Sequence, residues 1–405
     1  MKQADVLDLA KKTINRFRLC NSCLGRLFRE IEKDSSNYEK GELLLNLLKS
    51  NKNIKPNTCW LCEGLVSEIN HFTNLIFNTL KDYEFNTFLI GSKIDDDIIN
   101  RQKEIDEFLN KENTESIKTE LNREIGKILE SRLNKNVDFL NPDIMAVIDT
   151  AYDVVNLQIK SLFIYGRYKK LKRGIPQTKW YCKLCNGIGC RACNYKGKLY
   201  EESVEEYVSI EALKLTGGTD ESFHGSGRED IDVLMIGNGR PFVLEIKNPK
   251  IRNFDLQLYK NLTNKNAKEI VEIDNLKISN EQEIVRIKNS KFNKIYRITI
   301  ECEKCLNKEK LKEVALLLRD NTIEQFTPSR VSHRRAKKIR ERKIYNCDIE
   351  SIEGNIAKII VETESGTYVK ELISGDNGRT KPNLSEMLEV PCIVKELEVI
   401  EIKGE

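Results

Sequence analysis

The first residues whose types and spacing could do chemistry lie in a glycine-rich acidic segment, HGSGREDIDV, at residues 224–233. Glycines let the backbone of such a segment turn tightly and present the side chains that follow. We expect residues 231–236 to form a strand, which would place Asp230 and Asp232 on the same face. Arg228 lies two residues before Asp230 and would keep its carboxylate ionised by pairing with it. An ionised, desolvated aspartate can act as a nucleophile, although a surface turn before a strand has the same pattern.

The next glycines, Gly237 and Gly239, flank Asn238 and allow two interpretations. A GxG that follows a strand is part of dinucleotide-binding motifs, but those motifs continue into a helix. Here residues 241–246 (PFVLEI) form another apolar run that is typical of a strand. Because Asn-Gly between two apolar runs favours a tight reversal, the sequence predicts a β-hairpin and no dinucleotide site.

Cysteines form the second group of interest, and ten of the twelve lie in Cys-x-x-Cys pairs. In a chain without signs of secretion, such pairs are typical of metal sites rather than of disulfides. Each pair places two thiolates on one tight turn, and two such turns can enclose a tetrahedral zinc ion. A thioredoxin-like redox role is disfavoured because no βαβ pattern surrounds the pairs. The first predicted zinc site consists of Cys20, Cys23, Cys59 and Cys62.

A second cluster spans residues 182–193, where Gly187 and Gly189 give a short connector the freedom to reverse. Zinc is again the expected ion, while the spacing leaves an iron–sulfur cluster open. Its ligands would be Cys182, Cys185, Cys190 and Cys193. The remaining pair, Cys302 and Cys305, has no second pair to join, so we interpret it as structural or incidental.

Two basic segments could contact a polyanion. Residues 327–343 (TPSRVSHRRAKKIRERK) hold eight Lys or Arg against one Glu, and residues 167–173 (RYKKLKR) hold five basic residues in seven. Clusters of this kind contact phosphates in nucleic-acid-binding proteins, and a solvated helix face is the alternative for either one alone. Two clusters in one part of the chain favour nucleic acid.

The elements that must position these residues indicate an α+β protein. One helical stretch, residues 308–319, interrupts a series of short β-like runs after residue 151. Many short strands with few helices favour an antiparallel or mixed sheet. The expected strands span residues 231–236, 241–246, 295–301, 357–362 and 394–402.

The sequence upstream predicts two smaller parts, a cysteine-bearing head at residues 1–63 and a compact α+β module at residues 64–150. In the module, apolar residues at helical spacing predict one face of a helix, and Asn141-Pro142 ends the helical region before a strand at residues 144–148. The residues of that helix face are Leu121, Ile125, Ile128 and Leu129.

The composition disfavours a membrane or secreted protein. No run of 18 or more apolar residues is present, and the N-terminus, MKQADVLDLAKKTINRF, lacks the apolar block of a signal peptide. We therefore expect a cytoplasmic location.

Four of these segments together resemble the archaeal and eukaryotic tRNA pseudouridine-54/55 synthases, the tenth class of pseudouridine synthase. The residues that carry the resemblance are GSGREDIDVLMIGNGRPFVLEIKNPK (225–250), SLFIYGRYKKLKRGIPQTKW (161–180), TPSRVSHRRAKKIRERKIY (327–345) and SGTYVKELISGDNGRTKP (365–382). The head and the module at residues 64–150 resemble the zinc-bearing THUMP domain of that family, so the resemblance covers nearly the whole chain. It implies a mixed, largely antiparallel catalytic domain at residues 151–405.

The resemblance also implies the reaction. Uridine 54, uridine 55 or both, in the T-arm of tRNA, would be isomerised to pseudouridine without an organic cofactor. The essential aspartate of the family corresponds to Asp230, which would attack the flipped uridine at the ribose C1′ or through a glycal route. Tyr296 matches the aromatic residue that stacks on the uracil, and Lys370 matches the basic residue that pairs with the aspartate.

The remaining implied contacts hold the tRNA. The segment 327–343 resembles a loop that grips the tRNA arm, and the THUMP-like module would bind near the acceptor end. The expected substrate contacts are Arg228, Tyr368, Arg330, Arg334 and Arg335. The alternative function is a non-catalytic, zinc-containing adaptor that binds tRNA or the ribosome. THUMP domains also accompany methyltransferases and sulfur-transfer enzymes, but the sequence contains no strand–GxGxG–helix pattern and no P-loop.

Overall fold

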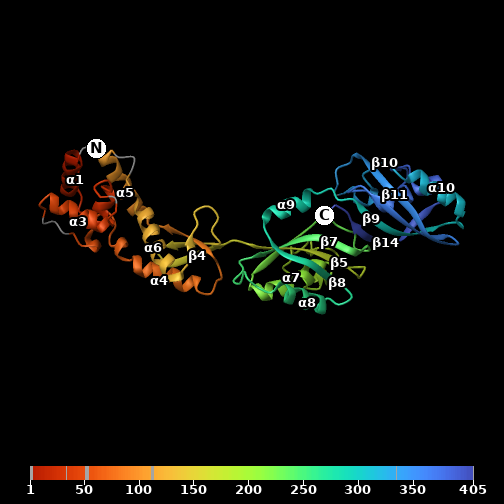
Figure 1. The fold of residues 1–405 in the computed structure, drawn as a ribbon, viewed down its shortest axis with the longest axis horizontal. Helices are drawn as coiled ribbons and strands as arrows, with labels where there is room; N and C mark the ends of the chain where they lie inside the picture. Colours follow the sequence, from red (N-terminus) through yellow and green to blue (C-terminus); the bar gives the residue numbers. More distant parts are fainter. Residues whose placement is uncertain (1–2, 33, 51–53, 111–113, 334, 405) are drawn as a thin grey trace. The chain divides into compact units, whose positions relative to one another are not determined.

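The structure is a computed structural model that describes residues 3–32, 34–50, 54–110, 114–333 and 335–404. The chain divides into two compact units. The first contains Met1–Lys160 and Asn248–Asn253, and the second contains Ser161–Lys247 and Phe254–Glu405. They can be followed by colour in Figure 1, from red to yellow and from yellow-green to blue. The short segment 248–253 belongs to the first unit because the backbone N–H of Glu84 donates to the carbonyl of Lys250 at 2.7 Å.

The N-terminal unit combines a four-stranded sheet, in the order β2-β1-β3-β4, with six α-helices among its described residues. Strand β1 runs parallel to β2 and β3, and β4 runs antiparallel to β3. The strands are β1 (Thr87–Lys93), β2 (Asn136–Val137), β3 (Ile144–Asp149) and β4 (Val154–Ile159). The helices are α1 (Gln3–Arg16), α2 (Asn21–Leu27), α3 (Asn37–Leu47), α4 (Ile69–Leu80), α5 (Asp96–Leu109) and α6 (Ile117–Leu133).

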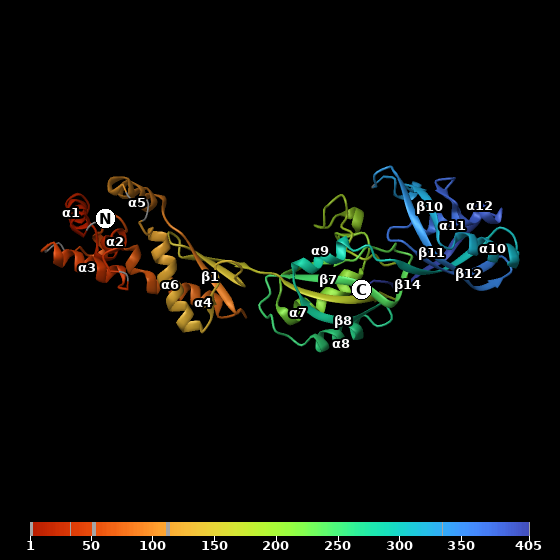
Figure 2. The same ribbon diagram turned by 45° about the horizontal axis from the view of Figure 1, so that its top comes forward.

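Helices α4 and α6 lie side by side on this sheet (Figure 2). The hydroxyl of Ser116 accepts from the N–H of Thr119 and so caps the start of α6. The predicted apolar face is confirmed for Leu121, Ile125 and Leu129, which are fully buried, whereas Ile128 is exposed. The predicted strand at residues 144–148 is confirmed as β3.

The cysteine-bearing head and the sheet share one hydrophobic core, which extends from Val6 to Ile148. Close packing of α2 on α3 depends on glycine, because a Cβ atom at Gly25 would lie 1.9 Å from the carbonyl oxygen of Asn37. The hydrophobic core is therefore continuous across residues 63 and 64. The division into a zinc-binding head and a tRNA-binding module stays a prediction.

The C-terminal unit is built on a ten-stranded sheet in which β14 and β7 are the parallel neighbours and the other described pairs are antiparallel. The order is β13-β10-β11-β12-β9-β14-β7-β5-β8, and β6 also pairs with β7. This confirms the expected mixed, largely antiparallel sheet. The strands are β5 (Leu162–Lys170), β6 (Asp220–Gly225), β7 (Leu234–Lys247), β8 (Val271–Ser279), β9 (Lys294–Cys302), β10 (Asn321–Phe326), β11 (Ile339–Glu353), β12 (Ile356–Thr363), β13 (Thr380–Lys381) and β14 (Cys392–Ile402).

Helices cover both faces of this sheet. Alternate residues of β5 and β7 face α7 and α8 in the main core, whereas Phe163, Tyr165 and Val243 point the other way and pack with α9. Helix α10 confirms the helix expected at residues 308–319 and lies on β10 and β11. The helices are α7 (Val204–Thr216), α8 (Leu256–Asn266), α9 (Glu281–Asn289), α10 (Lys308–Leu318), α11 (Val369–Ser374) and α12 (Leu384–Leu388). Among the described residues of the chain, we find no helix with the length and apolarity needed to cross a bilayer.

The predicted hairpin around Asn238 is wrong, because residues 234–247 form the single strand β7. Gly237 and Gly239 have φ values of +61° and +73°, so they kink the strand without reversing it. A Cβ atom at Gly237 would lie 1.8 Å from the carbonyl oxygen of Ile400, which shows how closely β14 approaches. Strand β5 pairs with β7 on both sides of the kink and keeps the strand direction constant.

One further expectation is corrected, and the pair interpreted as structural or incidental is resolved. Residues 229–233 form a loop and not the start of a strand, so Asp230 and Asp232 do not share a strand face. Cys302 forms a disulfide with Cys392, its direct neighbour across β9 and β14, while Cys305 is an exposed free thiol. The strands expected at residues 295–301, 357–362 and 394–402 are confirmed as β9, β12 and β14.

Candidate active site and metal centres

Asp230 lies on the loop that connects β6 to β7, with its side chain about one-third exposed (35%). Two cations from distant parts of the sequence face its carboxylate. Arg330 donates from Nη1 to Oδ2 at 2.8 Å, and Nζ of Lys370 lies 3.7 Å from the same oxygen. Two positive charges therefore lie next to the carboxylate oxygen that could attack an electrophilic carbon.

Arg330 and Lys370 are themselves held by other carboxylates. Arg330, in the 3₁₀ turn Ser329–Val331, donates to Glu371 on α11 through Nε at 2.6 Å. Lys370, the neighbour of Glu371 on α11, contacts Asp232 more closely than Asp230, at 2.7 and 2.9 Å. Burial acts to raise the pKa of Asp232, but the ammonium of Lys370 outweighs it and holds that pKa below its usual value. The result is an alternating set of charges around the exposed carboxylate of Asp230.

Arg228, which we expected to pair with Asp230, lies with its guanidinium carbon 4.9 Å from the ring centroid of Trp180. Arg330 makes a short contact with Asp230, and its expected contact with phosphate stays a prediction. The sequence contained no signal for this pair, because 100 residues separate the two partners.

Tyr296 lies in the middle of β9, between Val361 of β12 and Val399 of β14. Burial raises the pKa of Tyr296 to about 12, and the neighbouring Asp230 carboxylate acts in the same direction. Its phenol therefore stays protonated at neutral pH and offers a flat ring with a hydrogen-bond donor.

A buried polar cluster lies next to Asp230 in the sequence and was not predicted. The carboxylate of Glu229 accepts from the hydroxyl of Tyr168 at 2.8 Å and forms an ion pair with Nε of Arg240 at 2.8 Å. Gln177 donates from its amide to the Tyr168 hydroxyl at 2.8 Å and to the carbonyl of Gly227 at 3.0 Å. Because the side chains of Glu229 and Arg240 are almost inaccessible, this pair anchors the loop and cannot contact a substrate.

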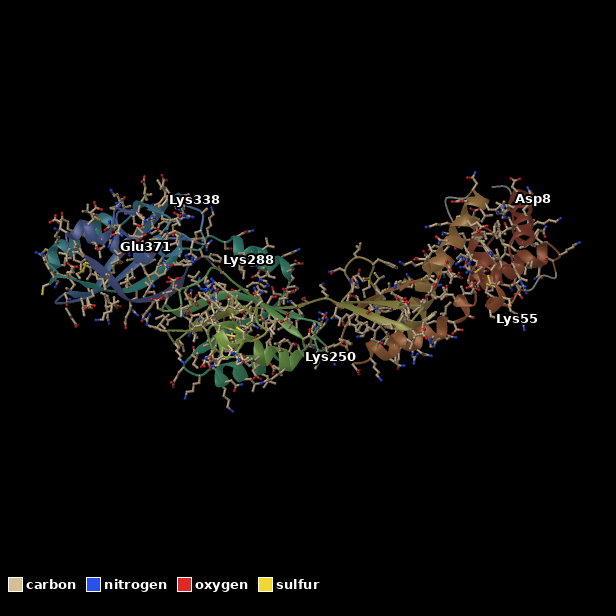
Figure 3. The ribbon with its side chains drawn as sticks, turned by 180° about the vertical axis from the view of Figure 1, so that it is seen from behind. Asp8, Lys55, Lys250, Lys288, Lys338 and Glu371 are labelled. Atoms are coloured by element: carbon tan, nitrogen blue, oxygen red, sulfur yellow. A yellow bond between two sulfur atoms is a disulfide. The ribbon has the colours of Figure 1, made fainter. Side chains whose placement is uncertain are left out.

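The remaining predicted substrate contacts lie near the basic segment 327–343. Arg335 is exposed, and Arg334 lies outside the described residues. Tyr368 is fixed through its backbone, which exchanges two hydrogen bonds with the amide of Gln325 at 2.8 and 2.9 Å. The ring of Tyr368 lies 5.9 Å from the guanidinium carbon of Arg340. Residues 335–339 are all exposed, as a phosphate-binding surface requires; Lys338 and Glu371 are labelled in Figure 3.

The second basic segment, residues 167–173, does not form such a surface. Arg167 donates to the carbonyls of Asn238 and Gly239 at the kink of β7, at 2.6 and 2.8 Å. Lys170 is fully buried, whereas Lys172 is exposed. The hypothesis of a phosphate-binding cluster here is therefore wrong, because most of these cations bind the protein's own backbone and carboxylates.

Both predicted cysteine clusters assemble. In each, the four Sγ atoms lie within 4.8 Å of one another, and neighbouring Sγ atoms approach to between 3.7 and 3.9 Å. A tetrahedron with Zn–S bonds of about 2.3 Å has edges of about 3.8 Å, so the thiolates fit a tetrahedral ion. The clusters consist of Cys20, Cys23, Cys59 and Cys62, and of Cys182, Cys185, Cys190 and Cys193.

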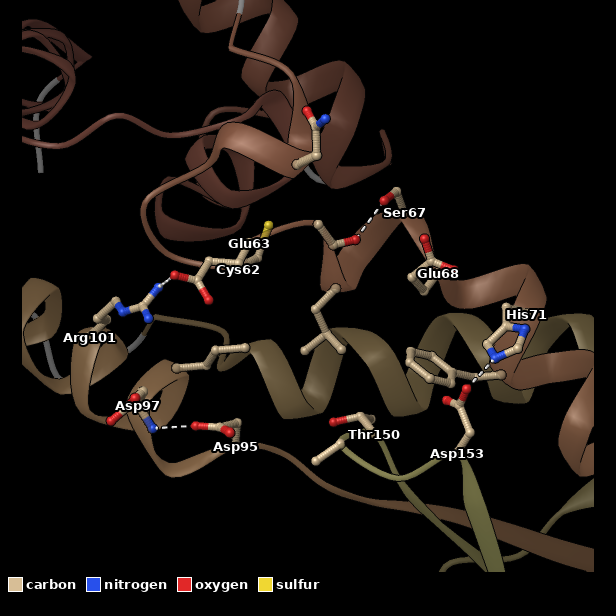
Figure 4. Close-up of a pocket in the computed structure, with 16 residues that line it drawn as sticks. Cys62, Glu63, Ser67, Glu68, His71, Asp95, Asp97, Arg101, Thr150 and Asp153 are labelled. Carbon is tan, nitrogen blue, oxygen red and sulfur yellow. Dashed lines mark hydrogen bonds and ion pairs between the residues drawn. The ribbon is translucent and has the colours of Figure 1, made fainter.

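A pocket of about 540 Å³ lies beside the first cluster in the N-terminal unit (Figure 4). Arg101 pairs with Glu63 at 2.6 Å and His71 pairs with Asp153 at 3.0 Å, so both of its basic side chains already have an acidic partner. The other acidic residues in its lining are Glu68, Asp95 and Asp97. This excess of negative charge disfavours the binding of phosphate in the pocket.

Comparison with known proteins shows which family the chain belongs to. Residues 163–403 match the family described as "Pus10, C-terminal", and residues 72–149 match "Pus10 THUMP domain, archaeal". The tRNA pseudouridine synthase Pus10 of Methanothermobacter marburgensis is 40% identical over 390 residues, which cover 95% of each chain. The same enzyme of Methanocaldococcus jannaschii is 41% identical over 427 residues, covering 96% of this chain and 93% of the relative. The chain belongs to the Pus10 family.

Members of the Pus10 family are tRNA pseudouridine synthases, and the chain is therefore an isomerase that acts on tRNA uridine. Membership of this family excludes the alternative of a non-catalytic adaptor. The N-terminal unit contains the THUMP domain, as the resemblance implied.

Proposed function

We propose that this Pus10 enzyme isomerises uridine 54, uridine 55 or both in the T-arm of tRNA, with Asp230 as the nucleophile. The observation that carries the proposal is the position of Asp230: a partly exposed carboxylate next to a buried anchor, Glu229, and facing two cations. A uridine flipped out of its stack could reach this carboxylate, and the unstacking costs a few kcal/mol that phosphate contacts must offset.

The chemistry can be written in steps that balance. The Asp230 carboxylate attacks C1′ of the ribose, and the N1–C1′ bond breaks to leave a uracil anion. The base turns to present C5, which forms the new C–C bond to C1′ and releases the carboxylate. The proton on C5 is then removed and N1 is protonated. In the glycal route, a base instead removes the ribose C2′ proton as the N1–C1′ bond breaks, and C2′ regains a proton when C5 bonds to C1′.

Tyr296 and the two cations have separate roles in this proposal. The ring of Tyr296 supports the detached uracil, and its protonated hydroxyl donates a hydrogen bond. Lys370 and Arg330 orient the carboxylate before attack, and Arg330 must move away from it when the uridine enters. The basic residues of segment 327–343, among them Arg335 and Arg334, bind tRNA phosphates, as do Arg228 and Tyr368 near the site. The THUMP domain binds the tRNA near its acceptor end.

We also propose that both cysteine clusters hold structural zinc. The four-thiolate donor sets and their separations support a tetrahedral ion, which would stabilise the fold and take no part in the isomerisation.

The test of the nucleophile is Asp230→Asn, with Asp232→Asn as the matched control. Transcribed tRNA is incubated with each variant, and pseudouridine is mapped by mass spectrometry after chemical labelling. We expect Asp230→Asn to bind tRNA with the wild-type Kd and to form no pseudouridine at position 54 or 55, because an amide is a poor nucleophile. Asp232→Asn should retain activity. Wild-type conversion by Asp230→Asn would overturn the assignment.

A further inference from the structure

Residues 170–174 and residues 230–232 lie side by side. Each backbone carbonyl of residues 230–232 accepts a hydrogen bond from the first segment. Lys170 donates from Nζ to the carbonyls of Asp230 and Ile231, at 3.1 and 3.2 Å. The backbone N–H of Gly174 donates to the carbonyl of Ile231 at 3.0 Å. Arg173 donates from Nη1 to the carbonyl of Asp232 at 2.7 Å. The backbone of the loop that carries Asp230 is therefore held from one side by a single segment.

The ammonium of Lys170 is the centre of this arrangement. Its side chain is completely buried, and its third hydrogen bond goes to the carbonyl of Ile175 at 3.1 Å. An ammonium has three N–H donors, so all of them are used. Burial lowers the pKa of Lys170 to about 8, although Glu229, 4.0 Å away, opposes the shift. A buried cation is costly unless it is fully bonded, which explains why it is aimed at backbone carbonyls.

The two sides of Asp230 are thus held in different ways. Arg330 binds the carboxylate itself and must leave when a substrate arrives. Lys170 and Arg173 bind the backbone beneath it, where no substrate atom can reach Lys170, so these bonds persist through the reaction. Only the second kind of contact can fix the direction of the carboxylate in the substrate complex.

We infer that Lys170 and Arg173 are positioning residues, which hold the backbone of residues 230–232 so that the carboxylate of Asp230 is aimed at the ribose of the bound uridine. The inference rests on the proposed role of Asp230. It assigns a function to two of the five cations in a segment that the sequence suggested for phosphate binding.

The first test measures single-turnover rates at saturating enzyme, together with the Kd for tRNA, for Lys170→Met and for the neighbour Lys172→Ala. Because misplacement of a reacting group by about 1 Å can cost roughly 100-fold in rate, we expect a loss of that order in Lys170→Met. The Kd should stay within about twofold of wild type, because Lys170 is inaccessible to RNA. Lys172→Ala, exposed in the same run, should react at the wild-type rate.

A pH profile separates positioning from a merely structural role. The groups that face Lys170 are Glu229, Arg240, Asp232 and Asp230. As the pH rises through about 8, Lys170 loses its proton and one of its three donors, so the wild-type rate should fall. In Lys170→Arg the guanidinium stays charged. The rate of this variant should therefore fall less between low and high pH than the rate of the wild type does. Profiles of the same shape would overturn the inference, whatever the absolute rates.

Arg173→Ala provides the variant for the case in which Lys170→Met does not fold. The Arg173 side chain is about one-third exposed and shares its guanidinium between the carbonyls of Asp232 and Leu397. We expect its single-turnover rate to fall by roughly tenfold, since one of the carbonyl contacts is lost while Lys170 keeps the others. An unchanged rate would count against the inference.

Asp230→Asn is assayed in parallel so that two kinds of failure can be told apart. If Asp230→Asn is inactive but Lys170→Met and Arg173→Ala react at the wild-type rate, the positioning role alone is overturned. If Asp230→Asn forms pseudouridine normally, the nucleophile assignment and the inference built on it both fall.

Discussion

The two cysteine clusters have the same four ligands but occupy different surroundings. All four cysteines of the first cluster belong to the hydrophobic core of the N-terminal unit, and all are buried. In the second cluster, none of the cysteines belongs to the described hydrophobic clusters of the C-terminal unit, and Cys185 and Cys190 are half-buried. The loop that carries them exposes large apolar side chains, among them Leu184 and Ile188. The same donor set therefore completes a core in one place and stabilises a surface loop in the other.

The largest effect that follows from this comparison is expected for Cys59→Ser. A structural zinc in small domains contributes about 10–16 kcal/mol at pH 7, which exceeds the net stability of most domains. Because the sulfur of Cys59 lies inside the core, loss of the ion should unfold much of the N-terminal unit. Metal analysis should show one equivalent less per chain, and hydrogen exchange should show lost protection in α2, α3 and α4.

An unchanged metal content in Cys59→Ser would contradict the first zinc site. If the metal is lost but the hydrogen-exchange pattern is unchanged, the ion does not stabilise the core. The proposed difference between the two clusters would then be wrong.

Gly25→Ala tests the same core without touching a ligand. Its Cβ atom would lie 1.9 Å from the carbonyl oxygen of Asn37, a backbone atom that cannot move alone, so α2 and α3 must separate. Overpacking of this kind costs about 1–3 kcal/mol or more, and the separation also displaces Cys23, which lies on α2. We expect a lower melting temperature and weaker retention of one metal ion against a chelator. Retention equal to that of the wild type would show that helix packing and the metal site are independent.

The sequence predicts those parts of the fold and the site that depend on residues close together in the chain. The ligands of both clusters were found because pairs at fixed spacing are a local pattern, and the strands at residues 295–301 and 357–362 were found from their apolar runs. The hairpin predicted around Asn238 was wrong because two glycines at this spacing are compatible with a hairpin and with a kinked strand. The choice is made by β5 and β14, which pair with β7 from distant parts of the chain.

The same limit applies to charge. A count of cations in residues 167–173 predicts phosphate binding, but it does not show whether a side chain points to solvent or to a backbone carbonyl. Arg330 and Asp230 come into contact only through the tertiary structure. The sequence around either residue therefore does not predict that the two form an ion pair. Spacing predicted the two cysteine clusters and the family resemblance suggested Asp230, whereas the ion pairs around Asp230 required the structure.

Cys185→Ser is the counterpart of Cys59→Ser in the second cluster. We expect it to remove one metal equivalent while shifting the melting temperature by only a few degrees, because no core residue loses its neighbours. Hydrogen exchange should increase within residues 182–199 and stay unchanged in the central strands of the sheet. Calorimetry with metal analysis checks both parts of this prediction. A melting temperature as low as that of Cys59→Ser would erase the distinction between the two clusters.

The smallest effect is expected for Gly189→Ala, which strains the second loop and leaves its ligands intact. Gly189 has a φ of +101°, and a Cβ atom there would lie 2.7 Å from the carbonyl oxygen of Tyr195. Holding a side-chain-bearing residue in such a conformation costs on the order of 1–3 kcal/mol, which corresponds to a loss in metal affinity of roughly 5-fold to 150-fold. The matched control is Gly354→Ala, which has a φ of +60° but open space around its Cβ position. Competition with a chromogenic chelator should show faster loss of one metal ion in Gly189→Ala alone. Equal loss in both variants would mean that the backbone of this loop does not shape the metal site, and that the cysteine spacing by itself is enough.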